Sequence, residues 1–418
     1  MRDLRVADLE VWTLCQQEER RQSDKIRLIA SENYVSHAVR EATGSLFTNK
    51  YSEGYPGRRY YEGQQVVDPL ETLAQERAKE LFGVKYVNVQ PYSGSPANLA
   101  VAFGLLEPGD TIMGLLLSHG GHLTHGHKIN YSSRFFNSVS YRLDATTGLM
   151  DYDALEAQAL EVKPKLIIAG FSAYSRIVDW ERIAAIAKKV GAYSQADIAH
   201  ISGLVVAGEH PSPAGIMDVI TTTTHKSLRG PRGAMIMTDS EDIYKKVNRA
   251  IIPGLQGGPH NHVTAAIAVA LKEAATPEFK AYGQQVVKNA AALAEGLMKR
   301  GFEIVSGGTD THLMVVDMTN KGVSGKVIAK ALDIAGIETS YSTIPDDPRK
   351  PMDPSGVRLG TPPVTSRGMK EAEMAKVAEW IDRVVSNHED EKILDATRTE
   401  IADFCAAFPA PGTDSSEW

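Results

Sequence analysis

Short apolar runs alternate with helical patterns through the first two-thirds of the chain. The apolar runs have the length and β-branched content of buried strands, and the segments between them repeat apolar residues at helical spacing. Continuous apolar strands separated by helices predict a mostly parallel sheet with helices on its faces. The expected strands are 84–90, 164–170, 191–200, 217–224 and 233–239, and the expected helices between them are 71–83, 152–161 and 180–191.

The pattern changes after about Glu273 and predicts a second, smaller α+β domain. We place an N-terminal arm and a large domain in residues 1–276 and a small C-terminal domain in residues 277–418, since 418 residues suit two domains. Only the tail at 409–418 has the composition of a disordered segment. The later part contains expected helices at 279–301, 325–336, 369–387 and 393–408 and expected strands at 302–308 and 311–318.

Composition and charge argue against several classes of function. The chain is 43% hydrophobic and 23% charged, as is usual for soluble globular proteins. Its formal net charge of −7 argues against a general nucleic-acid-binding surface. The mixed charges of the first 25 residues predict an amphipathic helix instead of a signal peptide, and no run approaches the roughly 18 apolar residues of a membrane span. Two distant cysteines, Cys15 and Cys405, favour a reduced, cytoplasmic protein.

The segment TTTTHKSLRGPRG, which runs from Thr221 to Gly233, places a single lysine after a β-branched run. One interpretation is a strand end followed by a solvated basic turn. The other is that Lys226 is held at a strand terminus to form an imine with a cofactor aldehyde. Ligands of parallel sheets bind outside the carboxyl ends of the strands, where both Lys226 and Asp197 are expected.

Three further segments could complete a cofactor site. Residues 93–95 (Ser-Gly-Ser) precede an expected helix and offer groups that bind phosphate, although an ordinary N-cap is the alternative. SHGGHLTHGH (118–127) has four histidines but no Cys or carboxylate, which favours a ring-stacking histidine over a zinc site. Asp197 ends an apolar strand, where a carboxylate needs a cationic partner such as a protonated pyridine nitrogen. Together with the lysine, these features predict a pyridoxal 5'-phosphate site and no metal site.

The chain resembles the serine hydroxymethyltransferase family over nearly its whole length. The segments that carry the resemblance are LIASENYVS, LFTNKYSEGYPGRRYYEG, VNVQPYSGSPAN, SHGGHLTHG, DIAHISGL, TTTTHKSLRGPRG, PGLQGGPHNH and GVRLGTPPVTSRG. The resemblance implies a fold-type I pyridoxal phosphate enzyme, with a mostly parallel seven-stranded sheet between helices in the large domain. It also implies the reversible conversion of L-serine and tetrahydrofolate, a co-substrate, to glycine and 5,10-methylenetetrahydrofolate.

The resemblance assigns roles to individual residues. Lys226 would carry the cofactor, Asp197 would face its ring nitrogen and His122 would stack on its ring. Arg358 would bind the substrate carboxylate with its two-pronged guanidinium, and Glu53 would transfer protons near the serine hydroxyl. The implied sets are Lys226, Glu53, His122, Asp197, Thr223 and His225 for catalysis; Ser93, Gly94, Ser95, His122, Ser172, Asp197, His200, His225, Lys226, Tyr51 and Gly258 for the cofactor; Ser31, Tyr61, Arg358 and Glu53 for the substrate; and Leu117, Gly121, Leu123, Tyr60 and Ser342 for folate.

The family is an obligate homodimer with shared active sites, and a tetramer stays open as an alternative. The resemblance therefore implies that the cluster Tyr51, Glu53, Tyr61 and Gly258 serves the cofactor of the neighbouring subunit.

One loop departs from the family pattern. ETSYSTIPDDP carries Tyr341 and Ser342 where the family commonly has Lys-Asn, and that asparagine contacts the pterin. The departure favours an alternative function, a folate-independent aldolase acting on 3-hydroxy or 2-methyl amino acids. A catalytically silent binding protein is a third interpretation, but the intact Lys226, Asp197 and Glu53, with Arg358, argue against it.

Overall fold

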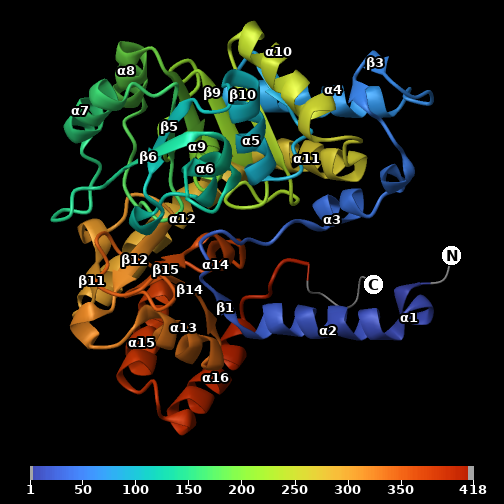
Figure 1. Ribbon diagram of the computed structural model, residues 1–418. Helices are drawn as coiled ribbons and strands as arrows, with labels where there is room; N and C mark the ends of the chain where they lie inside the picture. The colour runs from blue at the N-terminus through green and yellow to red at the C-terminus, as the bar shows by residue number, and fades with distance from the viewer. Residues whose placement is uncertain (1–2, 413–418) are drawn as a thin grey trace.

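The computed structural model describes residues 3–412, and a seven-stranded sheet forms the centre of its larger part (Figure 1). Strand β10 is antiparallel to both of its neighbours, β9 and β4, and the other paired strands are parallel. This arrangement confirms the predicted fold class. In spatial order the strands are β4 (Tyr86–Asn88), β10 (Ala234–Thr238), β9 (Val219–Thr223), β8 (Tyr193–Asp197), β7 (Leu166–Gly170), β5 (Thr111–Leu115) and β6 (Asn137–Tyr141).

Helices pack on the sheet because several of its strands are buried on both faces. Every residue of β7, β9 and β10 is buried. The expected helices form where the sequence supplies caps: α8 begins after Asp179, whose side chain accepts from the Arg182 amide, and ends at Gly191 in the left-handed region. The helices of this part are α3 (His37–Thr43), α4 (Val67–Phe82), α5 (Gly94–Leu105), α6 (Tyr131–Phe135), α7 (Tyr152–Val162), α8 (Trp180–Val190), α9 (Ser202–Ala207), α10 (Glu241–Arg249) and α11 (Asn261–Ala274).

The later part of the chain forms an antiparallel four-stranded sheet with helices, below the larger sheet in Figure 1. Only Glu303–Ile304 of the expected strand 302–308 is a strand, because a 3₁₀ turn follows at once. The sheet order is β11 (Glu303–Ile304), β12 (Leu313–Asp317), β15 (Gly356–Gly360) and β14 (Ser340–Ser342). The helices are α12 (Pro277–Met298), α13 (Gly325–Ile334), α14 (Pro362–Ser366), α15 (Glu371–Ser386) and α16 (Glu391–Cys405).

Helix α12 connects the two hydrophobic cores. Its first half supplies Phe279 and Val286 to the core of the large sheet, and Leu293 and Leu297 belong to the core around the small sheet. Ile26, from the N-terminal part of the chain, also belongs to this second core. The division at residues 276 and 277 stays a prediction.

The N-terminal segment forms two helices instead of the one expected. Asp3 caps α1 (Leu4–Ala7) and Asp8 caps α2 (Leu9–Asp24), so the chain bends between them. Neither helix buries a residue, and the pair projects to the right of the small sheet (Figure 1). After α2, strand β1 (Ile26–Arg27) pairs with β13 (Ile337–Glu338).

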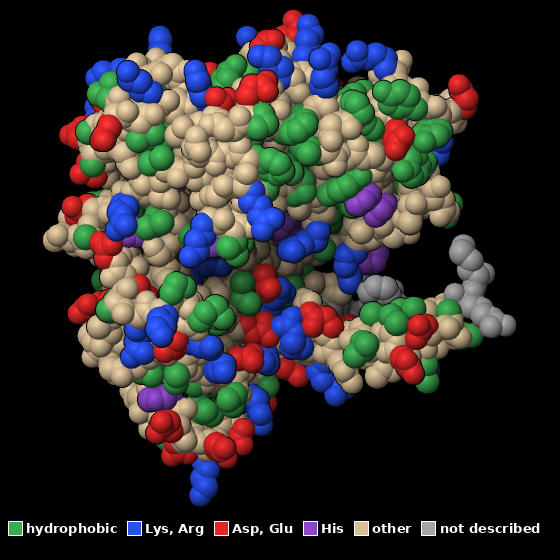
Figure 2. All heavy atoms as spheres, in the orientation of Figure 1, with side chains coloured by type: hydrophobic (Ala, Val, Ile, Leu, Met, Phe, Trp, Pro, Cys, Tyr) green, Lys and Arg blue, Asp and Glu red, His purple; other side chains and the backbone are tan. Residues whose placement is uncertain are grey.

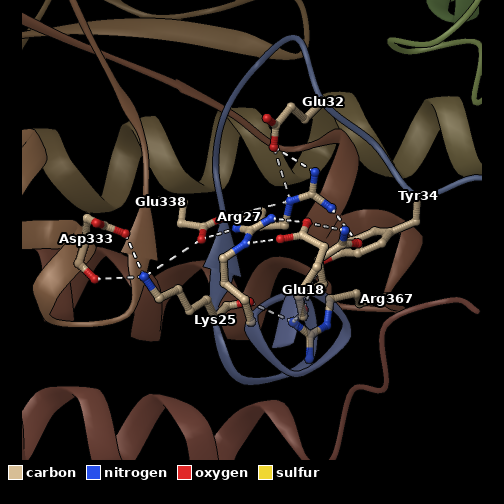
Figure 3. A network of polar contacts seen from close by, with 10 residues as sticks. Glu18, Lys25, Arg27, Glu32, Tyr34, Asp333, Glu338 and Arg367 are labelled. Atoms are coloured by element: carbon tan, nitrogen blue, oxygen red, sulfur yellow. Dashed lines mark hydrogen bonds and ion pairs between the residues drawn. The ribbon is translucent and has the colours of Figure 1, made fainter. Parts of the chain in front are cut away.

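A polar network fixes this N-terminal segment to α13, to β13 and to the residue that follows α14 (Figure 3). Arg27 forms an ion pair with Glu32 at 2.6 Å, and its guanidinium lies over the Tyr34 ring. Lys25 pairs with Asp333 at 2.6 Å. Arg367 donates to the backbone oxygens of residues 23, 25, 405 and 408. Arg27 precedes residues 28–31, and Glu32 and Tyr34 follow them, so the network holds this loop at both of its ends.

Two further expectations from the sequence concern the C-terminal tail and membrane-spanning helices. The predicted disorder of the tail falls mainly on residues 413–418, which lie outside the described residues. Within residues 3–412, no helix is both long and apolar enough to cross a membrane.

Candidate active site

A cavity of about 510 Å³ lies where β7, β8 and β9 end. Asp197 is the last residue of β8, and Lys226 follows the last residue of β9 by three positions. Strands β8 and β9 are adjacent and parallel, so both side chains reach the same edge of the sheet. The cavity is lined by twelve of the residues expected from the sequence: Ser31, Ser93, Gly94, Ser95, His122, Ser172, Asp197, His200, Thr223, His225, Lys226 and Arg358.

Lys226 has the properties of a nucleophilic amine. Burial lowers its pKa to about 8, the positive charges of Arg358 and Arg232 act in the same direction, and Asp197 opposes them. A substantial fraction of the amine is therefore neutral near physiological pH, as attack on an aldehyde requires. The solvated basic turn, which was the alternative interpretation, does not agree with this position inside the cavity.

Asp197 is held as a carboxylate by three donors. It accepts from His125 Nε2 at 2.9 Å, from Asn98 Nδ2 at 2.8 Å and from the Ala199 amide at 3.1 Å. Burial by itself would raise the pKa of Asp197, but these hydrogen bonds and the nearby charge of His125 keep it below its ordinary value. The cavity therefore contains a permanent negative charge that can face a protonated ring nitrogen.

His122 presents a neutral ring to the same cavity. Its Nδ1 accepts from the Thr124 amide at 3.2 Å and lies 2.7 Å from the Thr124 hydroxyl, and burial lowers its pKa to about 4. A neutral imidazole is suited to stacking on an aromatic ring. Among the described residues, no group of three or more His, Cys, Asp or Glu side chains is arranged to hold a metal ion.

The turn at residues 93–95 forms a cradle at the start of α5. Ser93 is the N-cap residue, but its side chain makes no capping hydrogen bond, which distinguishes it from an ordinary N-cap. A Cβ at Gly94 would lie 2.8 Å from the Thr223 methyl group, so only glycine fits without a shift. The helix amino end and the free hydroxyls suit a phosphate group.

Arg358 brings a cation to the other side of the cavity. On β15, it donates from Nη1 to the Ser172 carbonyl at 2.6 Å and from Nε to the Ser340 hydroxyl at 3.3 Å. Burial alone accounts for the lowering of its pKa to about 10, since no described carboxylate offsets it. A cation of this kind is ready to bind an anionic group of a ligand. Ser31 lies on the neighbouring loop, which the Arg27–Glu32 ion pair holds in place (Figure 3).

His200 contacts a second buried histidine. Its Nδ1 lies 3.4 Å from His312 Nε2, and the two rings are stacked at 5.6 Å. Burial is the main cause that lowers the pKa of both histidines, so both rings are neutral.

Tyr51, Glu53, Tyr61 and Gly258 form a separate cluster on the surface. The Tyr61 hydroxyl donates to Glu53 Oε2 at 3.2 Å, the Tyr51 and Tyr61 rings meet edge to face at 5.4 Å, and a Cβ at Gly258 would lie 3.0 Å from the Tyr51 ring. Tyr51 is 56% exposed and Tyr61 is 46% exposed, although both are aromatic. Figure 2 shows further exposed hydrophobic side chains on the larger part and on the projecting N-terminal helices. The expected residues thus separate into a cavity group and this surface cluster.

Comparison with known proteins identifies the family. The family model described as serine hydroxymethyltransferase matches residues 4–381. The chain belongs to the serine hydroxymethyltransferase family. Proteins named serine hydroxymethyltransferase from Desulfotalea psychrophila and Acidothermus cellulolyticus are 57% and 58% identical to it, over 99% and 98% of this chain and 97% of each relative. A third, from Sorangium cellulosum, is 56% identical over 99% of this chain and 97% of its own length.

Membership of this family establishes the fold-type I fold and the enzyme class. The chain is a glycine hydroxymethyltransferase, which agrees with the function expected from the sequence. The roles of the individual residues are not established by the family name and depend on the geometry above.

The residues expected to bind folate in this family lie outside the cavity lining of the described chain. Leu117, Gly121 and Leu123 belong to the turns that follow β5, and Ser342 ends β14. These two segments meet where the Thr343 hydroxyl donates to the Ser118 carbonyl at 2.9 Å. The Ser342 hydroxyl donates to the Thr343 carbonyl at 3.2 Å. Tyr60 is 70% exposed, in the same segment as the surface cluster. Their role in folate binding stays a prediction.

Two residues that support the site were missed in the sequence. His125 and Asn98 both bind Asp197, and Asn98 also donates to the Thr124 hydroxyl at 2.9 Å. His125 lies three positions after His122 in the histidine-rich segment, and Asn98 closes PYSGSPAN. Both segments were singled out, but nothing in either sequence shows that these side chains meet Asp197, which lies 99 positions after Asn98 and 72 after His125.

Proposed function

We propose that the chain binds pyridoxal 5'-phosphate in the cavity and converts L-serine and tetrahydrofolate to glycine and 5,10-methylenetetrahydrofolate. The observation that carries the proposal is the meeting of a lysine with a lowered pKa, an ionised aspartate and an anion cradle in one cavity. The cofactor has an aldehyde, a basic ring nitrogen and a phosphate, and each of these three groups has a complementary partner here. The close approach of Gly94 to the Thr223 methyl group, which a Cβ would meet at 2.8 Å, supports a tightly built turn at the phosphate position.

When bound, the cofactor supplies an aldehyde that condenses with amines and a ring that withdraws electrons from the substrate Cα. The negative charge of Asp197 would keep a proton on the ring nitrogen and so strengthen that withdrawal. Lys226 would hold the cofactor through its aldehyde group, and the neutral amine can accept a proton. His122 would support the cofactor through its flat, neutral ring.

Arg358 and Ser31 orient the substrate. The guanidinium would bind the serine carboxylate through Nη2, which its bonds to Ser172 and Ser340 do not use, and this would fix the direction of the Cα–Cβ bond. Orientation of this bond decides which bond at Cα breaks. The clamp therefore contributes to the choice of reaction as well as to affinity.

We also propose that the enzyme is a homodimer with shared active sites. Glu53 lies outside the cavity of its own chain, in an exposed aromatic cluster, and this supports a role in the partner's site. There Glu53 would transfer protons between the serine hydroxyl and the folate nitrogens. Free Cys15 and Cys405 support an enzyme of the cytoplasm.

A folate-independent aldolase is the second candidate, and the specific observation that favours it is Ser342 on β14. Serine has one hydroxyl where the family commonly has an amide, so one hydrogen bond to the pterin is lost. Serine cleavage measured with and without tetrahydrofolate distinguishes the two functions. We expect strong dependence on folate, whereas equal rates in its absence would support the aldolase.

A further inference from the structure

The carbonyl groups of the backbone around Glu53 are all hydrogen-bonded, although Tyr51 beside it is exposed. Glu53 precedes a short hairpin of β2 (Gly54–Tyr55) and β3 (Arg58–Arg59). Five consecutive carbonyls accept hydrogen bonds: Lys50 from Asn261 at 2.6 Å, Tyr51 from Gln64 at 3.1 Å, Ser52 and Gly54 from Arg59 at 2.8 and 2.9 Å, and Glu53 from the Tyr60 amide at 3.1 Å. A loop whose backbone is held in this way presents its side chains in a fixed geometry.

Arg59 makes the two bonds that flank Glu53. A single nitrogen, Nη1, reaches both the Ser52 carbonyl and the Gly54 carbonyl. The Arg59 side chain is only 3% exposed, and it is the one side chain that contacts the backbone on both sides of Glu53 among the hydrogen bonds of the described residues. Its position therefore helps to set where the Glu53 backbone lies, and Tyr61 contacts the carboxylate itself.

Arg59 is itself fixed by helix α4. Its Nε donates to Asp68 at 2.9 Å and its Nη2 donates to Glu71 at 2.7 Å. The Glu71 side chain is 2% exposed, and burial raises its pKa while Arg59 opposes that effect. Gln90 closes the arrangement by donating to both Glu71, at 2.8 Å, and the Gly54 carbonyl, at 2.9 Å.

We propose that Arg59 is the positioning residue of Glu53 and so acts on the active site of whichever subunit Glu53 serves. The inference rests on the proposed role of Glu53. Four bonds in three directions require a planar guanidinium, because the single ammonium of lysine cannot reach both carbonyls and both carboxylates at once. Loss of the clamp would let the Glu53 backbone move, and a displacement of about 1 Å can cost roughly a hundredfold in rate.

The test uses mixed dimers that have one working site. Subunits with Lys226→Ala retain Glu53, and subunits with Glu53→Gln retain Lys226. Arg59→Lys is added either to the first kind of subunit, which donates Glu53, or to the second, which does not. We expect kcat for serine cleavage to fall about tenfold to a hundredfold only in the first arrangement, with the cofactor still bound according to its absorbance. Equal losses in both arrangements would show a general structural role and overturn the proposal, as would no loss in either.

A second pair of dimers separates this proposal from the shared site. One subunit is unaltered and the other carries both Lys226→Ala and Glu53→Gln, so activity here requires that Glu53 act within its own chain. If these dimers are active and the first kind is not, the shared site is wrong and Glu53 serves its own chain. Arg59→Lys should then still lower kcat only when it is placed in the subunit that retains Glu53. A loss that does not follow Glu53 contradicts the inference in either case.

Two further variants protect the test against misfolding. Arg58→Lys is the matched control, since Arg58 is the exposed neighbour of Arg59 on β3 and should leave kcat unchanged. Asp68→Asn removes the charge of one of the two carboxylates that hold Arg59, at a side chain that is 27% exposed. It should lower kcat, but by less than Arg59→Lys does. In the Arg59→Lys homodimer we also expect faster hydrogen exchange of the Tyr60 amide, which donates to the Glu53 carbonyl, at an unchanged cofactor Kd. Unchanged exchange there would overturn the proposal.

Discussion

The substitution Arg358→Lys tests the carboxylate clamp, because it keeps the charge and removes the fork. Arg358 uses Nη1 for the Ser172 carbonyl and Nε for the Ser340 hydroxyl, and neither bond uses Nη2. We expect Nη2 to meet the substrate carboxylate, and a lysine ammonium would lose at least one hydrogen bond to it. A hydrogen bond to a charged group contributes about 1.5–3 kcal/mol. Since about 1.4 kcal/mol is a factor of ten, the KM for serine should rise roughly 10-fold to 150-fold.

Steady-state serine cleavage at saturating tetrahydrofolate gives this KM, and absorbance titration gives the cofactor Kd. The cofactor Kd should stay within about twofold, because lysine retains the positive charge that acts on the Lys226 pKa. Arg182→Lys on α8 is a matched control, since Arg182 lies in an exposed ion pair with Asp153. A serine KM within about twofold of the parent value would refute the clamp.

Three further outcomes follow from the proposed site. Mixing Glu53→Gln subunits with Lys226→Ala subunits should restore one working site per dimer, and mixtures without activity would contradict the shared site. Ser342→Asn should lower the folate KM by about twofold to tenfold, because a regained neutral hydrogen bond contributes about 0.5–1.5 kcal/mol; an unchanged KM would argue against this position as a folate contact. Only the neutral form of the Lys226 amine reacts with the aldehyde, and burial lowers the pKa of this amine to about 8. The rate of cofactor uptake by the cofactor-free chain should therefore rise as the pH passes through about 8 and then level off. A rise confined to the ordinary range of lysine, near pH 10.5, would show that burial does not tune this amine.

Much of the central sheet could be predicted because several of its inner strands are apolar or β-branched runs that are buried along their whole length. Strands β7, β9 and β10 are buried at every position, and their sequences contain the expected β-branched and apolar runs. Edge strands do not provide this signal. Strand β6 (NSVSY) is half-exposed and polar at the edge of the large sheet, and β14 (SYS) is similar in the small sheet. Strand β5 is apolar, but its run TIMGLLL continues into the next turn and did not suggest a separate strand.

The residues of the cavity could be predicted from local motifs, but the groups that hold them could not. Asp197 and Lys226 follow strand-like runs, so the sequence suggested their place at the sheet edge. Asn98 reaches Asp197 across 99 positions, and no local pattern encodes that contact. Arg59 lies in one of the segments that carry the family resemblance. Its role is visible only in the structure, where the carbonyls on both sides of Glu53 accept hydrogen bonds from it.

Borohydride reduction of the purified enzyme tests the central claim, that Lys226 carries pyridoxal phosphate in the cavity lined by Asp197 and the turn at residues 93–95. Reduction makes the bond between the lysine nitrogen and the cofactor permanent, and peptide mapping then locates it. The account predicts a yellow protein whose cofactor is fixed to Lys226 in stoichiometric amount, and a Lys226→Ala protein that retains no label after reduction. Labelling at any other lysine, or full labelling of Lys226→Ala, would contradict the account.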